Sequence, residues 1–128
     1  MIGEVTIDGE YASWGDLPSG WFSAELPVVD AVPFEADTDL ANQAAIKGNI
    51  MLCIRSPQRG STPFVEKVKR ASEAGAAAVV IVNTDDALMT MVGSGYTSAI
   101  PVLMIKSSDA PRLRKHGSAL LREEKGEF

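Results

Sequence analysis

Residues 59–83 read RGSTPFVEKVKRASEAGAAAVVIVN, which predicts a turn, an amphipathic helix and a buried strand in succession. Apolar residues recur at Phe64, Val68 and Ala71 and form one stripe of a helix with 3.6 residues per turn. Gly75 supplies the left-handed residue at which such a helix ends. Residues 76–82 (AAAVVIV) are short, rich in valine and apolar throughout, which is typical of a strand covered on both faces.

Two further apolar stretches flank this unit, GNIMLCI at residues 48–54 and AIPVLMI at residues 99–105. Both predict strands. A strand, a helix and a second strand at this spacing indicate a right-handed crossover between parallel neighbours. The loops at residues 55–62 and 83–98 should therefore leave the same end of adjacent strands and lie side by side. The pattern predicts a mixed α/β class.

The polar side of the predicted helix carries alternating charges. Glu66 with Arg70 and Lys69 with Glu73 are spaced four residues apart, which predicts two ion pairs along the helix surface. Pro63 fits the first helical turn, where its missing N–H needs no partner.

The first half of the chain is different in character. Apolar and polar residues alternate over residues 2–8, and several are β-branched, which predicts a strand. Residues 9–20 predict a turn-rich loop that contains Trp14. A flavodoxin-like chain would open with a strand and a helix, whereas this one opens with about 45 residues of turns, prolines and short strands. The opening therefore favours a β-rich module. A second helix is predicted over residues 107–115, and Gly117 is the residue that stops it.

Several short motifs follow one another in a fixed order. They are Gly48, Asn49 and Ile50 at the first strand, Arg59, Gly60 and Phe64 at the turn, Lys67 in the helix, residues 74–83, and Ile100 with Pro101. In this order they resemble the protease-associated (PA) domain family over roughly residues 24–122. The resemblance implies a swivelling β/β/α domain, a barrel-like β-sandwich flanked by short helices, and residues 1–128 as one domain.

The resemblance also implies a function. The chain is expected to be a non-catalytic interaction module that binds or gates a peptide or a neighbouring domain of the same full-length protein, with no cofactor. Family members imply a secretory, vacuolar or extracellular setting. The family's two cysteines are absent here, because Ser61 or Thr62 stands at one cysteine position and residues 31–40, where the other is expected, hold none. Residues 1–8 do not read as a signal peptide, so the compartment stays open.

Charge is uneven along the chain, whose net charge is −5. Residues 1–64 carry nine acidic and three basic side chains, and residues 65–128 carry eight and nine. An acidic half argues against nucleic acid as a partner, which requires clustered Lys and Arg. It is consistent either with solubility alone or with a basic peptide as the partner.

Composition also excludes several kinds of site. A serine triad needs one histidine, and the only one, His116, lies at a predicted helix end beside Lys115, where a structural role is favoured. A single histidine excludes a histidine-based metal cluster, so neither catalytic nor metal-binding residues are predicted. Cys53 is the only cysteine and lies in an apolar run, where it should be buried. No apolar run approaches the ~20 residues that span a bilayer.

Candidate binding residues gather in the two loops that should meet at one sheet edge. Arg55 and Arg59 either receive a carboxylate or carbonyl of a partner, or pair with acids such as Glu35. Asp85 and Asp86 either form a turn or, in an alternative reading, serve a small flavodoxin-like ligand-binding or hydrolytic domain. The predicted partner-binding set is Arg55, Arg59, Asp85, Asp86, Met89, Met91 and Tyr96.

Overall fold

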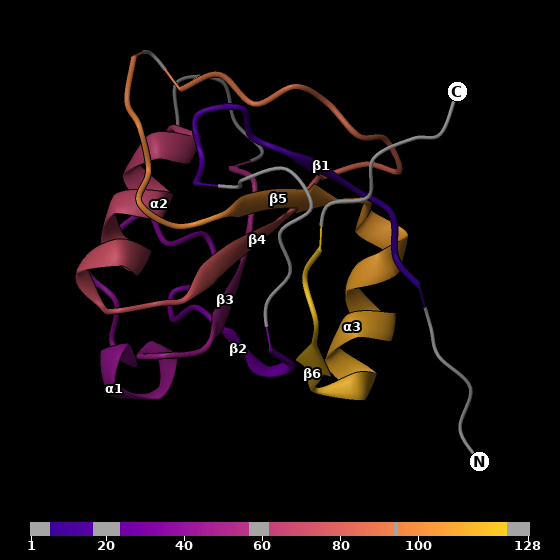
Figure 1. Ribbon diagram of the computed structural model, residues 1–128, viewed down its shortest axis with the longest axis horizontal. Coiled ribbons are helices and arrows are strands. Elements are labelled where there is room, and N and C mark those ends of the chain that lie inside the picture. The colour runs from indigo at the N-terminus through magenta and orange to yellow at the C-terminus, as the bar shows by residue number, and fades with distance from the viewer. Residues whose placement is uncertain (1–5, 17–23, 57–61, 94, 123–128) are drawn as a thin grey trace.

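A computed structural model describes residues 6–16, 24–56, 62–93 and 95–122. Its centre is a six-stranded sheet in the order β1-β5-β4-β3-β2-β6, which Figure 1 shows between two helices. The strands are β1 Gly9–Tyr11, β2 Leu26–Asp30, β3 Ile50–Ile54, β4 Ala78–Val82, β5 Val102–Ile105 and β6 Ser118–Ala119.

The four inner strands are parallel, as the sequence predicts for β3 and β4. β3 pairs with β4 along its whole length, and β4 pairs with β5 in the same direction. The short outer strands run the other way, since β1 is antiparallel to β5 and β6 is antiparallel to β2. β4 is buried at all five positions, which confirms the strand that residues 76–82 predict.

The helices are short, and they cover opposite faces of the sheet (Figure 1). They are α1 Gln43–Ile46, α2 Phe64–Glu73, the 3₁₀ turn η1 Ser107–Asp109, and α3 Ala110–His116. α2 begins at Phe64 with Pro63 as its N-cap, one residue later than expected. Gly75 and Gly117 follow α2 and α3 with φ of 84° and 76°, which confirms both as left-handed ends.

Alternate side chains of the central strands feed two cores, because successive residues of a strand point to opposite faces. Met51, Cys53 and Ile81 pack with Val68 and Ala71 of α2 on one face. On the other face the core contains strand residues and side chains of α3; its members there include Ile50, Leu52, Val80, Ala110 and Leu113. The stripe predicted for α2 and the burial of Cys53 are both confirmed.

Two fold-level expectations need correction. The first described strand is Gly9–Tyr11, where a loop was expected, and of the predicted strand at residues 2–8 the described part, residues 6–8, is not in a strand. The parallel strands β2 to β5 lie in chain order with no reversal, unlike a flavodoxin-like sheet. The mixed α/β class is confirmed, in the form of one curled six-stranded sheet with a few short helices. Within the described residues, none of the helices has the length and apolar character needed to span a bilayer.

Candidate functional site

The two predicted contact loops do begin side by side. β3 and β4 are parallel neighbours that end at Ile54 and Val82. The backbone N–H of Arg55 donates to the carbonyl of Val82 at 2.8 Å, which carries the pairing into the first loop residue. The two loops therefore leave the same carboxyl edge of the sheet.

Arg55 is half-buried at this edge, and its partner is an amide rather than an acid. Its Nη1 donates to Oδ1 of Asn83 at 3.0 Å. In the part of the chain that the structure describes, no ion pair joins Arg55 to an acid such as Glu35, so the alternative of a tie to those acids is wrong for Arg55. A guanidinium has five N–H donors in a planar fork, and most of them stay available to an incoming acceptor.

Asp85 and Asp86 are exposed and shape the turn that follows β4. Asn83 donates from Nδ2 to Oδ1 of Asp85 at 3.1 Å, and the backbone N–H of Ser108 donates to Oδ1 of Asp86 at 2.7 Å. The Asp85 carbonyl accepts from the N–H of Ser107 at 3.1 Å. These bonds attach the loop to η1. They agree with the alternative in which the two acids form a turn. The described residues contain no cluster of three or more histidine, cysteine or acidic side chains able to hold a metal ion.

The remaining predicted contact residues are divided. Met89 and Tyr96 are half-buried and pack against the core on the α2 face. Met91 is only 2% exposed, so its side chain supplies packing there and not contact area. Arg59 lies outside the described residues.

An aromatic contact that the sequence did not predict fixes the long loop over the sheet. Trp14 meets the ring of Tyr96 edge-on, with ring centroids 6.1 Å apart. Its Nε1 donates to the Met91 carbonyl at 3.0 Å, and its own carbonyl accepts from the N–H of Ser98 at 2.7 Å. A Cβ on Gly93 would lie 2.5 Å from the Trp14 ring, so only glycine fits there without a shift. No local signal in the sequence links residue 14 to residues 91–98.

Lys67 is the second feature that sequence reasoning missed. It has no exposed surface, and its Nζ donates to the carbonyl of Glu35 and, at 2.9 Å, to Oγ of Ser56. Burial lowers the pKa of Lys67, and the neighbouring Cys53 opposes that shift. Lys67 lies three residues after Phe64 and four before Ala71, which puts it on the apolar stripe of the helix. This spacing was a usable signal that Lys67 would be buried.

The charges of α2 are not paired as expected. Nζ of Lys69 lies 3.8 Å from Oε1 of Glu66, three residues earlier in the helix. The two ion pairs predicted at a spacing of four residues, Glu66 with Arg70 and Lys69 with Glu73, are therefore wrong. Arg70 instead donates from Nη1 to the Ala36 carbonyl at 2.9 Å. Together with Lys67, Arg70 holds the segment at residues 33–37 against α2.

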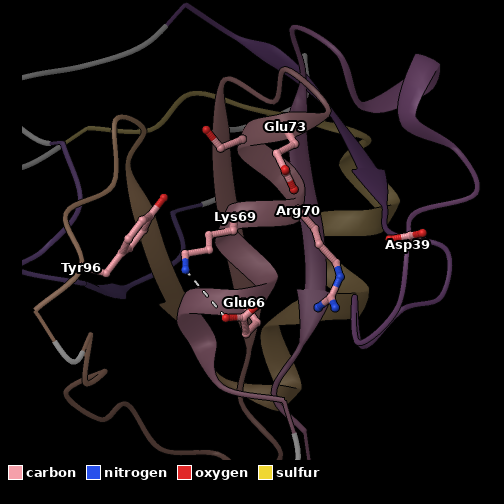
Figure 2. Close-up of a pocket in the computed structure, with 7 residues that line it drawn as sticks. Asp39, Glu66, Lys69, Arg70, Glu73 and Tyr96 are labelled. Atoms are coloured by element: carbon pink, nitrogen blue, oxygen red, sulfur yellow. Dashed lines mark ion pairs between the residues drawn. The ribbon is translucent and has the colours of Figure 1, made fainter.

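A hollow of about 410 Å³ lies on the outer face of α2 (Figure 2). Figure 2 shows Lys69 directed toward Tyr96 on one side, and Arg70 directed toward the segment that carries Asp39 on the other. The hollow thus joins three parts of the chain, and its lining is Asp39, Glu66, Lys69, Arg70, Ser72, Glu73 and Tyr96.

Comparison with a model of the PA domain family matches residues 24–113, which include β2 to β5, α2 and most of α3. This chain belongs to the protease-associated domain family. The match is shorter at its end than the roughly 24–122 inferred from the motifs. The PA domain is a non-catalytic module, and the similar proteins include zinc aminopeptidases.

In two relatives the matching segment is a small part of a longer protein. The chain is 38% identical over 81 residues to aminopeptidase YwaD of Bacillus subtilis, covering 62% of this chain and 17% of that protein. It is 29% identical over 120 residues to an ER degradation-enhancing alpha-mannosidase-like protein 3 of Xenopus laevis, covering 85% of this chain and 13% of that one.

A solved structure agrees in fold. The zinc aminopeptidase BSAP from Bacillus subtilis superimposes with a TM-score of 0.64 at 30% identity, over 91% of this chain and 28% of the aminopeptidase. The chain thus spans less than a third of each of these relatives.

Proposed function

We propose that residues 1–128 act as one non-catalytic PA module that binds or gates a peptide, or a neighbouring domain of the same longer protein, through the carboxyl edge of its sheet. The family match and the presence of PA domains in aminopeptidases support a module beside a peptidase unit. A swivel of the module as a unit would open or close access for a polypeptide.

The observation that carries this proposal is the bond between Arg55 and Asn83. It holds a half-buried guanidinium at the end of β3 and leaves most of its donors unpaired among the described residues. Asp85 accepts a hydrogen bond from the same Asn83, and Asp85 and Asp86 are both exposed. An extended peptide offers C=O and N–H groups in alternation, so a donor beside acceptors suits its main chain.

Residues beyond the two acids extend this edge with apolar area. Met89 and Tyr96 are half-buried on the same loop, and thioether and phenol side chains supply adaptable contact surface. The proposed contact residues are therefore Arg55, Asp85, Asp86, Met89 and Tyr96, with Arg59 retained from the sequence alone. Met91 was in the set predicted from the sequence, but its side chain is buried and it is left out of the proposal.

The test is binding of the 128-residue chain to a library of short extended peptides, followed by mapping of a bound peptide through backbone amide shifts in NMR. Shifts should cluster at Arg55, Asn83 and Tyr96. Arg55→Ala should weaken binding about tenfold if it is an anchor. Arg112→Ala on α3, whose guanidinium already pairs with Asp109 at 2.8 Å, is the matched control and should have no effect.

The opposite result would move the site. Unchanged affinity in Arg55→Ala with a loss in Arg112→Ala and Arg114→Ala would place the contact on the α3 face and contradict the proposed edge. Met91→Ala is not a contact test, because its side chain is in the core.

A further inference from the structure

We infer that Asn83 is the positioning residue of the proposed contact edge, because its one buried amide holds the Arg55 guanidinium of the first loop and the turn of the second loop in a fixed relation. This inference rests on the proposed peptide-binding function and names the residue through which the two loops act together. Asn83 directly follows β4 and is only 2% exposed.

The amide of Asn83 uses all of its hydrogen-bonding capacity. An asparagine amide offers two donors on its nitrogen and two lone pairs on its oxygen. Oδ1 accepts from Nη1 of Arg55 at 3.0 Å and from the backbone N–H of Thr84 at 2.8 Å. Nδ2 donates to Oδ1 of Asp85 at 3.1 Å and to the carbonyl of Ala87 at 2.8 Å. These four bonds fix the orientation of the amide.

Three of the four bonds fold the turn after β4, and the fourth serves a different purpose. Thr84, Asp85 and Ala87 lie within four residues of the amide, so the bonds to them close the turn locally. The bond to Arg55 spans 28 positions of the chain and adds nothing to that closure. A guanidinium is planar, so an acceptor fixed on Nη1 restricts the direction of the whole group. Asn83 therefore orients the cation on which the proposed function depends.

The charges at the two ends of the amide strengthen this arrangement. The amide oxygen bonds to the Arg55 cation and the amide nitrogen bonds to the Asp85 carboxylate, so the amide dipole lies between opposite charges in the favourable direction. Hydrogen bonds with a charged partner are stronger than neutral ones, and bonds in a chain polarise one another. A peptide carbonyl that binds Arg55 therefore also changes the bond between Asn83 and Asp85, and the two loops respond as a unit.

The first test needs no partner. NMR of the chain with isotope-labelled arginine measures rotation of the Arg55 guanidinium about its Cζ–Nε bond, and Arg55→Ala assigns the signal. Asn83→Leu removes both ends of the amide in a side chain of similar size, so rotation should become about fivefold faster, the change expected for the loss of one hydrogen bond. Asn83→Asp keeps the acceptor for Arg55 and loses both donors. Its rotation should stay slow while the backbone amide signals of residues 85–87 shift.

The second test is a double-mutant cycle with acetylated and amidated pentaalanine, whose only polar groups are those of its main chain. Arg55→Ala should weaken binding about tenfold and Asn83→Leu about threefold. Because Asn83 acts through Arg55, the double variant should bind like Arg55→Ala alone.

A matched control and a folding check accompany both tests. Asn49 also donates from its amide to a backbone carbonyl, that of Ala45, but at the other end of β3. Asn49→Ala should change neither the rotation of the Arg55 guanidinium nor the affinity. A thermal melt of each variant separates a loss of binding from a loss of folding, and Asn83→Asp carries the rotation test by itself where Asn83→Leu does not fold.

Three outcomes would overturn the role of Asn83: unchanged rotation in Asn83→Leu, fast rotation in Asn83→Asp, or a further threefold loss of affinity, roughly, from Asn83→Leu in the Arg55→Ala background. The proposed edge survives each of them when the parent chain binds pentaalanine with shifts at Arg55 and Tyr96. No binding of pentaalanine by the parent contradicts the proposed function and, with it, the role of Asn83 in binding, even where the rotation shows that Asn83 holds Arg55.

Discussion

Nζ of Lys67 donates a hydrogen bond to Oγ of Ser56 at 2.9 Å, although Lys67 has no exposed surface. The same amine donates to the carbonyl of Glu35. One buried side chain of α2 therefore connects the end of β3 with the segment at residues 33–37. Both acceptors are neutral, so the charge of Lys67 is offset only by more distant acids.

Replacement of this amine should cost stability. Lys67→Met leaves the Glu35 carbonyl without its donor, and a buried acceptor without a partner costs about 1–3 kcal/mol. Removal of the buried charge acts in the other direction, so a net loss of about 1–2 kcal/mol is expected from urea unfolding at pH 7. Lys69→Met, exposed on the same helix, is the control and should change stability by less than about 0.5 kcal/mol. A more stable Lys67→Met variant would show that burying the charge of Lys67 destabilises the fold by more than its hydrogen bonds stabilise it.

The charge of Lys67 also predicts a pH dependence. Burial lowers the pKa of Lys67 in the folded state below the ordinary lysine value of 10.5. Between the lowered pKa and 10.5 the folded protein binds fewer protons than the unfolded chain, so stability rises with pH in that window. The difference in unfolding free energy between the parent and Lys67→Met, both in a Cys53→Ala background, should grow as pH rises toward 10.5. A difference that is flat across the window would contradict the lowered pKa.

Cys53 predicts the opposite slope at higher pH. Burial raises the pKa of the Cys53 thiol from 9.0 to about 12, with Lys67 opposing the shift. The unfolded chain ionises first, so the stability that the protonated thiol contributes is complete below pH 9 and is lost as pH rises toward 12. The limiting slope is about 1.4 kcal/mol per pH unit. Comparison of the unfolding free energies of the parent and Cys53→Ala between pH 8 and 11 measures it, and parallel curves would rule it out.

The central strand predicts a strong effect of a buried charge. Val80 is 1% exposed in the middle of β4, so Val80→Asp would place an unpaired carboxylate among apolar side chains at a cost of several kcal/mol. We expect an insoluble or unfolded chain by circular dichroism. Val92→Asp is the control at a valine that is 70% exposed, and it should fold normally. A soluble Val80→Asp variant with an unchanged Tm would mean that the sheet order is wrong.

Gly93 tests the contact between Trp14 and the long loop. The Cβ of Gly93→Ala would lie 2.5 Å from the Trp14 ring, so the ring or the loop must move. Such overpacking costs about 1–3 kcal/mol, and the displaced indole should change its fluorescence maximum. Thr90→Ala, at an exposed position of the same loop, should alter neither property. An unchanged Tm in Gly93→Ala would show that the loop is not held by Trp14.

The sequence by itself determined the central helix and strands and their burial, but not the first strand. Spacing of 3.6 residues located α2, the valine run located β4, and glycines marked both helix ends, because these features depend on neighbours within about ten residues. Family motifs added the identity of the module. The same periodicity was a usable signal for the burial of Lys67 in α2, but sequence reasoning missed it.

Only the tertiary structure decided which distant groups meet. Arg55 bonds to Asn83 because two parallel strands end together, and Arg70 bonds to the Ala36 carbonyl and not to Glu66 because residues 33–37 pack against α2. Trp14 reaches Tyr96 across 82 positions of the chain. The partner of a polar or aromatic side chain depends on which surfaces come into contact after the sheet has formed, and local sequence patterns carry no record of that choice.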